Sequence, residues 1–167
     1  MRKKAYYSIS ENPFAFYFGL VYPFLAQKNI LSDQVFFDNF IKDKLYNSFI
    51  PHSFENICRE YLIRKNKEGR WNPPFLSIGS YTYNDAKRKM KGQFDLVSND
   101  KLGHIFYEYK FTNEKVGLNV FKEERQLKDL KLDYYKLGFF SKEGFERGDW
   151  SKNCLCFTLD DLYKKEK

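Results

Sequence analysis

Apolar residues recur with the spacing of a helix in the first part of the chain. Ser32 and Asp33 are suited to cap a helix that continues to about Asn47. The apolar face of this helix consists of Val35, Phe36, Phe40, Ile41 and Leu45. Residues 5–31 are rich in Phe and Tyr without a clean period. We therefore expect a packed extension there, part strand and part short helix.

A second helix is predicted where Pro51 stops the first one and Ser53 begins a new apolar pattern. Its apolar positions follow the i, i+3, i+4, i+7, i+8 spacing: Phe54, Ile57, Cys58, Tyr61 and Leu62. Glu55 lies in the predicted first turn, where a carboxylate interacts favourably with the helix dipole. The pattern fades near Lys67, and Gly69 ends the helix.

The second half of the chain carries short apolar runs that are typical of strands. We predict strands at residues 75–78 with an extension to 81–83, at 93–97, at 104–111, at 134–140 and at 154–158, and helices at about 118–131 and 159–163. This order predicts a mixed α/β core whose early strands form a meander. The glycine patterns of the Rossmann fold and of the P-loop are absent from the sequence. Neither a doubly wound dinucleotide site nor P-loop binding of ATP is therefore expected.

The strand at 104–111 carries a carboxylate and an ammonium group among apolar residues. Alternation along the strand places His104, Phe106, Glu108 and Lys110 on one face and Ile105, Tyr107, Tyr109 and Phe111 on the other. Two largely apolar faces are typical of a buried central strand. Glu108 and Lys110 are costly in such a strand unless they pair or bind something. The pattern of Glu108 and Lys110 is compatible with an ordinary ion pair and with a functional site.

The preceding strand contains Asp95, whose apolar neighbours predict an interior position. A short turn joins the two strands, so we expect Asp95 and Glu108 close together at the same end of the sheet. Two carboxylates with open positions suit Mg²⁺, or Mn²⁺ in its place, because such an ion keeps several waters. Lys110 beside them is placed to orient a water or to stabilise negative charge on a phosphate. Metal-assisted attack on a phosphodiester needs these parts.

The charge distribution adds a basic region directly before the Asp95 strand. The chain has 29 Lys and Arg against 22 Asp and Glu, a net charge of +7. Residues 64–91 contain eight basic and two acidic residues, which account for +6 of this charge. We expect contacts with nucleic-acid phosphates here, from Lys87, Arg88, Lys89 and Lys91, and stacking of bases on Trp71, Tyr81 and Tyr83. A solvated charged face is the alternative.

Cysteine usage and the N-terminal apolar run bear on the location of the protein. Three cysteines, without a CxxC pair or a nearby His-x-His, indicate a reducing cytoplasmic environment rather than a disulfide or zinc framework. The apolar run at residues 14–26 is too short to span a bilayer and is interrupted by Pro23. We therefore expect a core or docking segment there, and no membrane partner.

Two resemblances make the chemistry more specific. Asp95, then about a dozen residues, then Glu108-x-Lys110 resembles the PD-(D/E)xK nuclease signature, and the predicted order of elements is similar to that superfamily's core. A second resemblance rests on FENICREYL (54–62), IG (78–79), GQFDLV (92–97) and YEYKF (107–111), together with FYFGLVYP (16–23) and FSKEGF (140–145). In register, these segments are similar to the C-terminal region of a family of archaeal and bacterial AAA-type ATPases. That region is known as domain of unknown function 234, and the likeness covers nearly the whole chain.

The family resemblance implies a restriction-endonuclease-like fold, a PD-(D/E)xK core with a mixed central sheet flanked by helices. We expect this domain at residues 51–167, and an aromatic N-terminal extension and helix at residues 1–50 that pack on it. Gln93 and Tyr109 stand where the family usually has Glu and Cys. The ATPase and helix-turn-helix portion of the family is missing. The chain is therefore expected to be a fragment, a split gene product or an isolated C-terminal part.

The resemblance also implies roles for individual residues. Asp95 and Glu108 are the implied metal ligands, Lys110 is the implied catalytic lysine, and Glu55 is a helical acid that assists metal or water binding. The leading hypothesis is Mg²⁺- or Mn²⁺-dependent hydrolysis of DNA phosphodiesters by a domain normally attached to an AAA-type ATPase. One alternative is a non-catalytic nucleic-acid-binding or regulatory module. Another is a structural role, in which the N-terminal segment docks on an ATPase or on a second copy of the chain.

Overall fold

The structure is a computed structural model, and it describes residues 9, 11–85, 90–117, 132–148 and 154–164. The chain forms two compact units, Met1–Phe54 and Glu55–Lys167. We call the first the helical unit and the second the sheet unit. Within the described residues, no helix combines the length and the apolar composition that crossing a bilayer requires.

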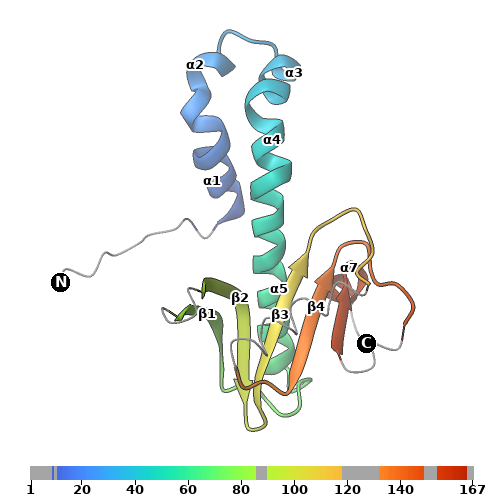
Figure 1. Cartoon of the computed structure of the whole chain (residues 1–167). Coiled ribbons are helices and arrows are strands. Elements are labelled where there is room, and N and C mark those ends of the chain that lie inside the picture. Colours follow the sequence, from blue (N-terminus) through green and yellow to red (C-terminus); the bar gives the residue numbers. More distant parts are fainter. Residues whose placement is uncertain (1–8, 10, 86–89, 118–131, 149–153, 165–167) are drawn as a thin grey trace, which may run out of the picture. The chain divides into compact units, whose positions relative to one another are not determined.

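The helical unit contains two helical runs and no strand among its described residues (Figure 1). The first run consists of α1 (Asn12–Phe16), η1 (Tyr17–Val21), η2 (Tyr22–Phe24) and α2 (Leu25–Lys28). The second consists of α3 (Asp33–Phe36), η3 (Phe37–Ile41), α4 (Lys42–Lys44), η4 (Leu45–Phe49) and the start of α5 (Ile50–Lys67). The strand expected within residues 5–31 is therefore wrong for the part that the structure describes.

Aromatic side chains at helical spacing account for this difference. Phe16, Leu20 and Phe24 recur at every fourth residue, so they lie on one side of the first helical run. Phe24 contacts Phe40 with ring centroids 5.2 Å apart, and Phe16 contacts Phe49 at 5.6 Å. The buried centre of this packing is formed by Leu20, Phe36 and Ile41.

The two helices predicted from Ser32 and from Ser53 belong to one uninterrupted helical run. Ser32 caps it as expected, because its side chain accepts a hydrogen bond from the backbone N–H of Val35 at 3.5 Å. Pro51 does not end the run: it is the second residue of α5, which follows the π-helical turn η4 without a break. Ser53 does not start a helix, and its hydroxyl instead donates to the carbonyl oxygen of Phe49 at 2.8 Å.

The sheet unit is built on one five-stranded sheet in the order β1-β2-β3-β4-β5. The strands are β1 (Ser77–Asp85), β2 (Met90–Asp100), β3 (Gly103–Lys110), β4 (Lys136–Ser141) and β5 (Cys154–Thr158), and α7 (Leu159–Tyr163) follows. The first three strands are antiparallel neighbours, whereas β3, β4 and β5 are parallel. The predicted α/β class, the early meander and the central position of β3 are confirmed. The helix predicted at about 118–131 lies outside the described residues.

The turn between β2 and β3 sets the register of the two strands. Asp100 pairs with Gly103, whose φ of +128° is a conformation that favours glycine. The carboxylate of Asp100 accepts hydrogen bonds from the backbone N–H of Leu102 at 2.8 Å and from the hydroxyl of Tyr135 at 2.5 Å. From this turn the register runs to Leu96 opposite Tyr107.

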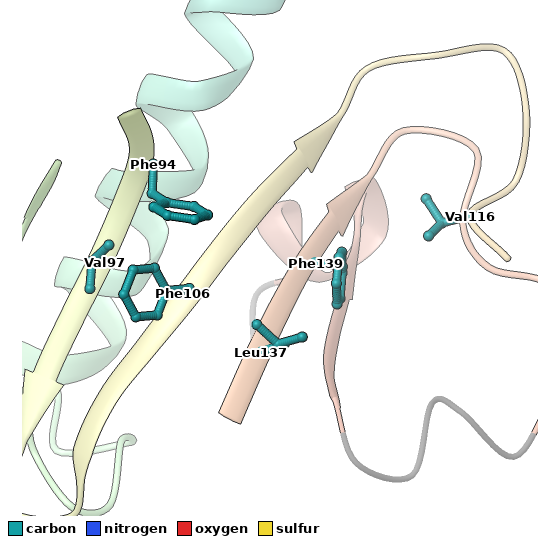
Figure 2. Close-up of a cluster of buried hydrophobic side chains, with 6 residues drawn as sticks. All are labelled: Phe94, Val97, Phe106, Val116, Leu137 and Phe139. Atoms are coloured by element: carbon teal, nitrogen blue, oxygen red, sulfur yellow. The ribbon is translucent and has the colours of Figure 1, made fainter. Parts of the chain in front are cut away.

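The two faces of the sheet are covered by different side chains. On the α5 face, the ring centroid of Phe140 lies 6.3 Å from that of Tyr61 of α5 and 5.7 Å from that of Tyr109 of β3. The predicted apolar face of α5 is confirmed in the sheet unit by the buried Cys58, Tyr61 and Leu62. Figure 2 shows the buried cluster of the opposite face, which contains Phe94, Val97, Phe106, Val116, Leu137 and Phe139. Alternation along β3 therefore places Glu108 and Lys110 on the face of Phe106.

Candidate functional site

Strands β2 and β3 separate next to the candidate catalytic residues Asp95, Glu108 and Lys110. Their pairing ends at Leu96 opposite Tyr107, whereas β2 continues beside β1 to Met90 and β3 continues beside β4 to Lys110. Figure 1 shows the two strands diverging above their paired part. We call this split the sheet fork, and it contains Asp95 on β2 and Glu108 and Lys110 on β3. As expected, Asp95 and Glu108 lie at the same end of neighbouring strands.

A β-bulge at the fork changes the environment of Asp95. Gly79 pairs with Val97 and Tyr81 pairs with Phe94, so the stretch of β2 is one residue longer than the facing stretch of β1. A bulge bends a strand and redirects its side chains. The interior position predicted for Asp95 is therefore wrong: the residue is exposed. Its carboxylate accepts a hydrogen bond from the side-chain amide of Gln93 at 3.1 Å.

Glu108 and Lys110 form an ion pair, which was one of the two interpretations left open by the sequence. Lys110 Nζ lies 3.0 Å from Glu108 Oε1, and the two side chains keep 28% and 37% of their exposure. They follow the buried Phe106 along one face of β3, so the pair lies where that face opens to solvent. Partial exposure leaves both groups accessible to a ligand, and it also weakens the attraction between them.

Tyr109 lies between these two residues in sequence and points to the α5 face. Burial raises the pKa of its phenol far above the usual range, and the charges of Cys58, Glu55 and Asp95 add to this effect. Glu55 of α5 and Asp95 of β2 therefore both approach the ring of Tyr109. Sequence reasoning missed this residue as a neighbour of the site. The alternation of side chains along β3 could have indicated this position, because it directs the middle residue of Glu-x-Lys toward α5.

Glu55 differs from its expected place within the helix. It is the sixth residue of α5 rather than part of a first turn, so the dipole of the helix start does not explain it. The residue is half-buried. After burial itself, the charge of Glu55 is the next cause that raises the pKa of the Cys58 thiol. The structure thus places Glu55 close enough to Tyr109 and Cys58 to affect the pKa values of both.

The predicted acids come from three elements, Glu55 from α5, Asp95 from β2 and Glu108 from β3. Within the part of the chain that the structure describes, no three Asp, Glu, His or Cys side chains are grouped to hold a metal ion. Mg²⁺ in phosphate-processing sites is usually held by one or two carboxylates, with waters and substrate oxygens as the other ligands. Asp95 and Glu108 at the fork are two carboxylates, which is the type of ligand that such a Mg²⁺ site uses. Glu55 is a supporting acid rather than an equivalent third ligand.

The structure describes only part of the region that the sequence predicted to contact nucleic acid. Lys87, Arg88 and Lys89 lie outside the described residues, and Lys91 is exposed on β2. The aromatic rings expected to stack on bases also contact other rings of the protein, and Tyr81 is 38% exposed. The ring pairs are Trp71 with Phe75 and Phe157, Tyr81 with Phe106, and Tyr83 with Phe94.

Comparisons with known proteins give one family and an uncharacterized relative. The model of DUF234, the domain of unknown function 234, matches residues 17–138, and the family is described as archaeal and bacterial proteins of unknown function. An uncharacterized protein of Methanocaldococcus jannaschii is 32% identical over 171 residues, which cover 96% of this chain and 35% of that protein. The chain thus spans about a third of the length of this relative. No solved structure matches the chain.

Proposed function

Because the chain belongs to DUF234, a family of archaeal and bacterial proteins of unknown function, we propose a function from its sheet fork. The sheet unit is a metal-dependent nuclease-type domain that hydrolyses DNA phosphodiesters. The observation that carries this proposal is the fork itself. It presents the carboxylates of Asp95 and Glu108 and the ammonium of Lys110 at the point where two central strands separate.

The topology of the sheet unit supports a PD-(D/E)xK fold. A helix, an antiparallel meander of β1, β2 and β3, and a strand β4 parallel to β3 follow one another in the order expected for that core. The length of the M. jannaschii relative leaves room for a further domain. An AAA-type ATPase, on the same chain or as a partner chain, remains part of the proposal for this reason and because of the family resemblance.

Each residue of the fork has a distinct role in this proposal. A divalent cation, Mg²⁺ or Mn²⁺, bound by Asp95 and Glu108 would supply an activated water and neutralise phosphate charge. Lys110 holds the Glu108 carboxylate in place and brings a positive charge to the position where the scissile phosphate becomes more negative. Glu55 acts from α5 as a supporting acid. Gln93 donates to Asp95 and so orients that carboxylate.

The test is cleavage of linear, circular and single-stranded DNA with Mg²⁺ or Mn²⁺. Lys110→Met keeps the aliphatic length of the side chain and removes its charge. We expect it to lower the cleavage rate by about 100-fold or more, the cost of losing one charge-stabilising group. Circular dichroism should show an unchanged fold.

Lys136→Met is the matched control, because Lys136 lies opposite Ile105, at the other end of the β3–β4 pairing. It should cleave DNA like the wild type. The nuclease proposal fails if the wild type cuts no DNA with either metal, or if Lys110→Met cuts as fast as the wild type.

A second candidate function is a non-catalytic nucleic-acid-binding or regulatory module. Two observations favour it: the closed ion pair of Glu108 with Lys110, and the lack of a three-acid group among the described residues. The same assay separates the two candidates. DNA affinity without metal-dependent cutting, in the wild type and in the presence of an ATPase partner, supports the second one.

A further inference from the structure

A basic cleft lies in the sheet unit, between the C-terminal end of α5 and α7. Its volume is about 480 Å³, within the range of small-molecule sites. The cations that line it are Arg64, Lys65, Arg70 and Lys164, and Glu68 is the acid among the lining residues. The cleft is built from residues other than those of the sheet fork.

The end of α5 has a defined geometry that brings Arg70 to the cleft. Gly69 ends the helix as predicted, with a φ of +70°. The N–H of Gly69 donates to the carbonyl of Asn66 at 3.1 Å, and the N–H of Arg70 donates to the carbonyl of Lys65 at 2.9 Å. This pair of bonds is the Schellman arrangement, which turns the chain back on the helix end. Arg70 therefore sits on a fixed turn.

The other wall of the cleft is tied to α5 by its own contacts. Thr158 and Asp161 form a capping box at the start of α7. Arg64 Nη2 donates to the carbonyl oxygen of Leu162 at 3.2 Å, across 98 residues of sequence. Both walls of the cleft thus consist of helix ends with defined backbone geometry, joined by the Arg64–Leu162 hydrogen bond.

The residues that line the cleft carry a net positive charge. Arg64 and Lys65 lie in the last turns of α5, where cations stabilise the helix C-terminus. Arg70 follows the end of α5 directly, and Lys164 is the C-cap of α7, so all four cations gather at the ends of these two helices. Two acids lie against these cations: Glu68 is 3.5 Å from Arg70, and Asp161 is 3.2 Å from Lys164. Among the described residues, the four lining cations thus outnumber these two acids.

Two tyrosines give the cleft an aromatic component. Tyr61 is buried, and its ring lies 5.5 Å from Lys65 Nζ and 5.8 Å from the guanidinium carbon of Arg64. Tyr163 also lines the cleft but is 69% exposed. An exposed ring beside several cations is suited to stack on a base while the cations contact phosphate.

We propose that this cleft binds a nucleoside phosphate, with Arg70 and Lys164 on the phosphate and Tyr163 stacked on the base. Two sources share this chemistry, a single-stranded nucleic acid and a free nucleotide. The site is separate from the fork, and its binding function does not require that the fork cleaves DNA.

The experiment measures fluorescence anisotropy of a labelled single-stranded oligonucleotide, with EDTA present so that no metal-dependent cutting occurs. The double variant R70Q/K164Q should bind at least about tenfold more weakly and reduce the slope of log affinity against log salt by about 1.4, because each lost phosphate contact removes about 0.7. Y163A should bind about fivefold more weakly or worse, with the salt slope unchanged, since it removes stacking alone.

The controls are an exposed cation and an exposed ring that are not among the lining residues of the cleft. K101Q and Y46A meet these conditions and should bind like the wild type. Competition by AMP or ATP distinguishes the sources: displacement at low concentration identifies a free nucleotide, whereas displacement only by oligonucleotide identifies a strand. A labelled nucleotide replaces the oligonucleotide as probe in the first case.

The proposal is overturned if the wild type binds neither probe, or if R70Q/K164Q and Y163A bind like K101Q and Y46A. Lys110→Met provides the remaining distinction. Loss of cutting in Lys110→Met with unchanged anisotropy supports both proposals separately. Unchanged cutting in that variant rejects the nuclease proposal and leaves the result for the cleft standing.

Discussion

The helical unit and the sheet unit treat aromatic residues in opposite ways. In the sheet unit Phe139 and Phe140 have no exposure, and they lie at the centre of the packing. In the helical unit Phe14, Phe18 and Tyr22 are 59%, 47% and 55% exposed. Two packed helical runs offer one narrow contact zone, whereas a sheet covered on its faces surrounds a central strand with neighbours. The two kinds of packing therefore yield a deep core in one unit and a shallow one in the other.

The same contrast explains where the candidate sites are. The fork and the basic cleft both lie in the sheet unit, in which strand register and helix caps hold side chains at defined positions. The exposed rings of the helical unit have no comparable support. We therefore expect ligand chemistry in the sheet unit, and stability differences that follow burial.

The largest expected effect is in the sheet core. Phe139→Ala should reduce the free energy of unfolding of the sheet unit by about 3–5 kcal/mol, because it opens a cavity in a fully buried cluster. Both tryptophans belong to residues 55–167, so urea unfolding followed by tryptophan fluorescence reports on this unit. The matched variant Phe36→Ala removes a buried ring of the helical unit and should leave the fluorescence midpoint in place. Equal shifts for both variants would show that the two units unfold together.

An intermediate effect is expected at the cap of α7. Burial raises the pKa of Asp161, but hydrogen bonds from Thr158 and Lys164 outweigh it, so the pKa is lowered. A carboxyl with a lowered folded-state pKa adds stability above its unfolded pKa, and this stability is lost as the pH falls through the folded value. Asp161→Ala should thus cost about 1 kcal/mol at pH 7. The difference in the free energy of unfolding between Asp161→Ala and the wild type should disappear in acid, as measured by urea unfolding from pH 7 downward. A gap that stays constant with pH would contradict the role of the charge.

The smallest effect is expected at Asp38 of the helical unit. A hydrogen bond from Gln34 at 2.7 Å, and then Lys42 at 3.5 Å, lowers the pKa of this carboxyl. The group is open to solvent, so the interaction is screened. Asp38→Ala should shift the thermal midpoint of the far-ultraviolet circular dichroism less than Asp161→Ala does. A larger shift for Asp38→Ala would reverse the ranking of the two units.

Local spacing explains the features that could be predicted. The buried stripe of Cys58, Tyr61 and Leu62, the end of α5 at Gly69 and the central position of β3 all follow from residues close in sequence. The pairing of Glu108 with Lys110 follows from alternation along one strand. The identity and strand positions of the candidate site residues were accessible in the same way.

The amino-acid sequence by itself thus determined the class of the fold, the meander of its first three strands and the residues that carry charge into a central strand. Only the tertiary structure decided that Asp95 lies on a bulge in solvent, that β2 and β3 separate at the acids, and that Arg70 and Lys164 meet in one cleft. The reason is physical. Periodicity records which way a side chain points along its own element, whereas register, bulges and clefts depend on hydrogen bonds and packing between segments that are distant in the chain.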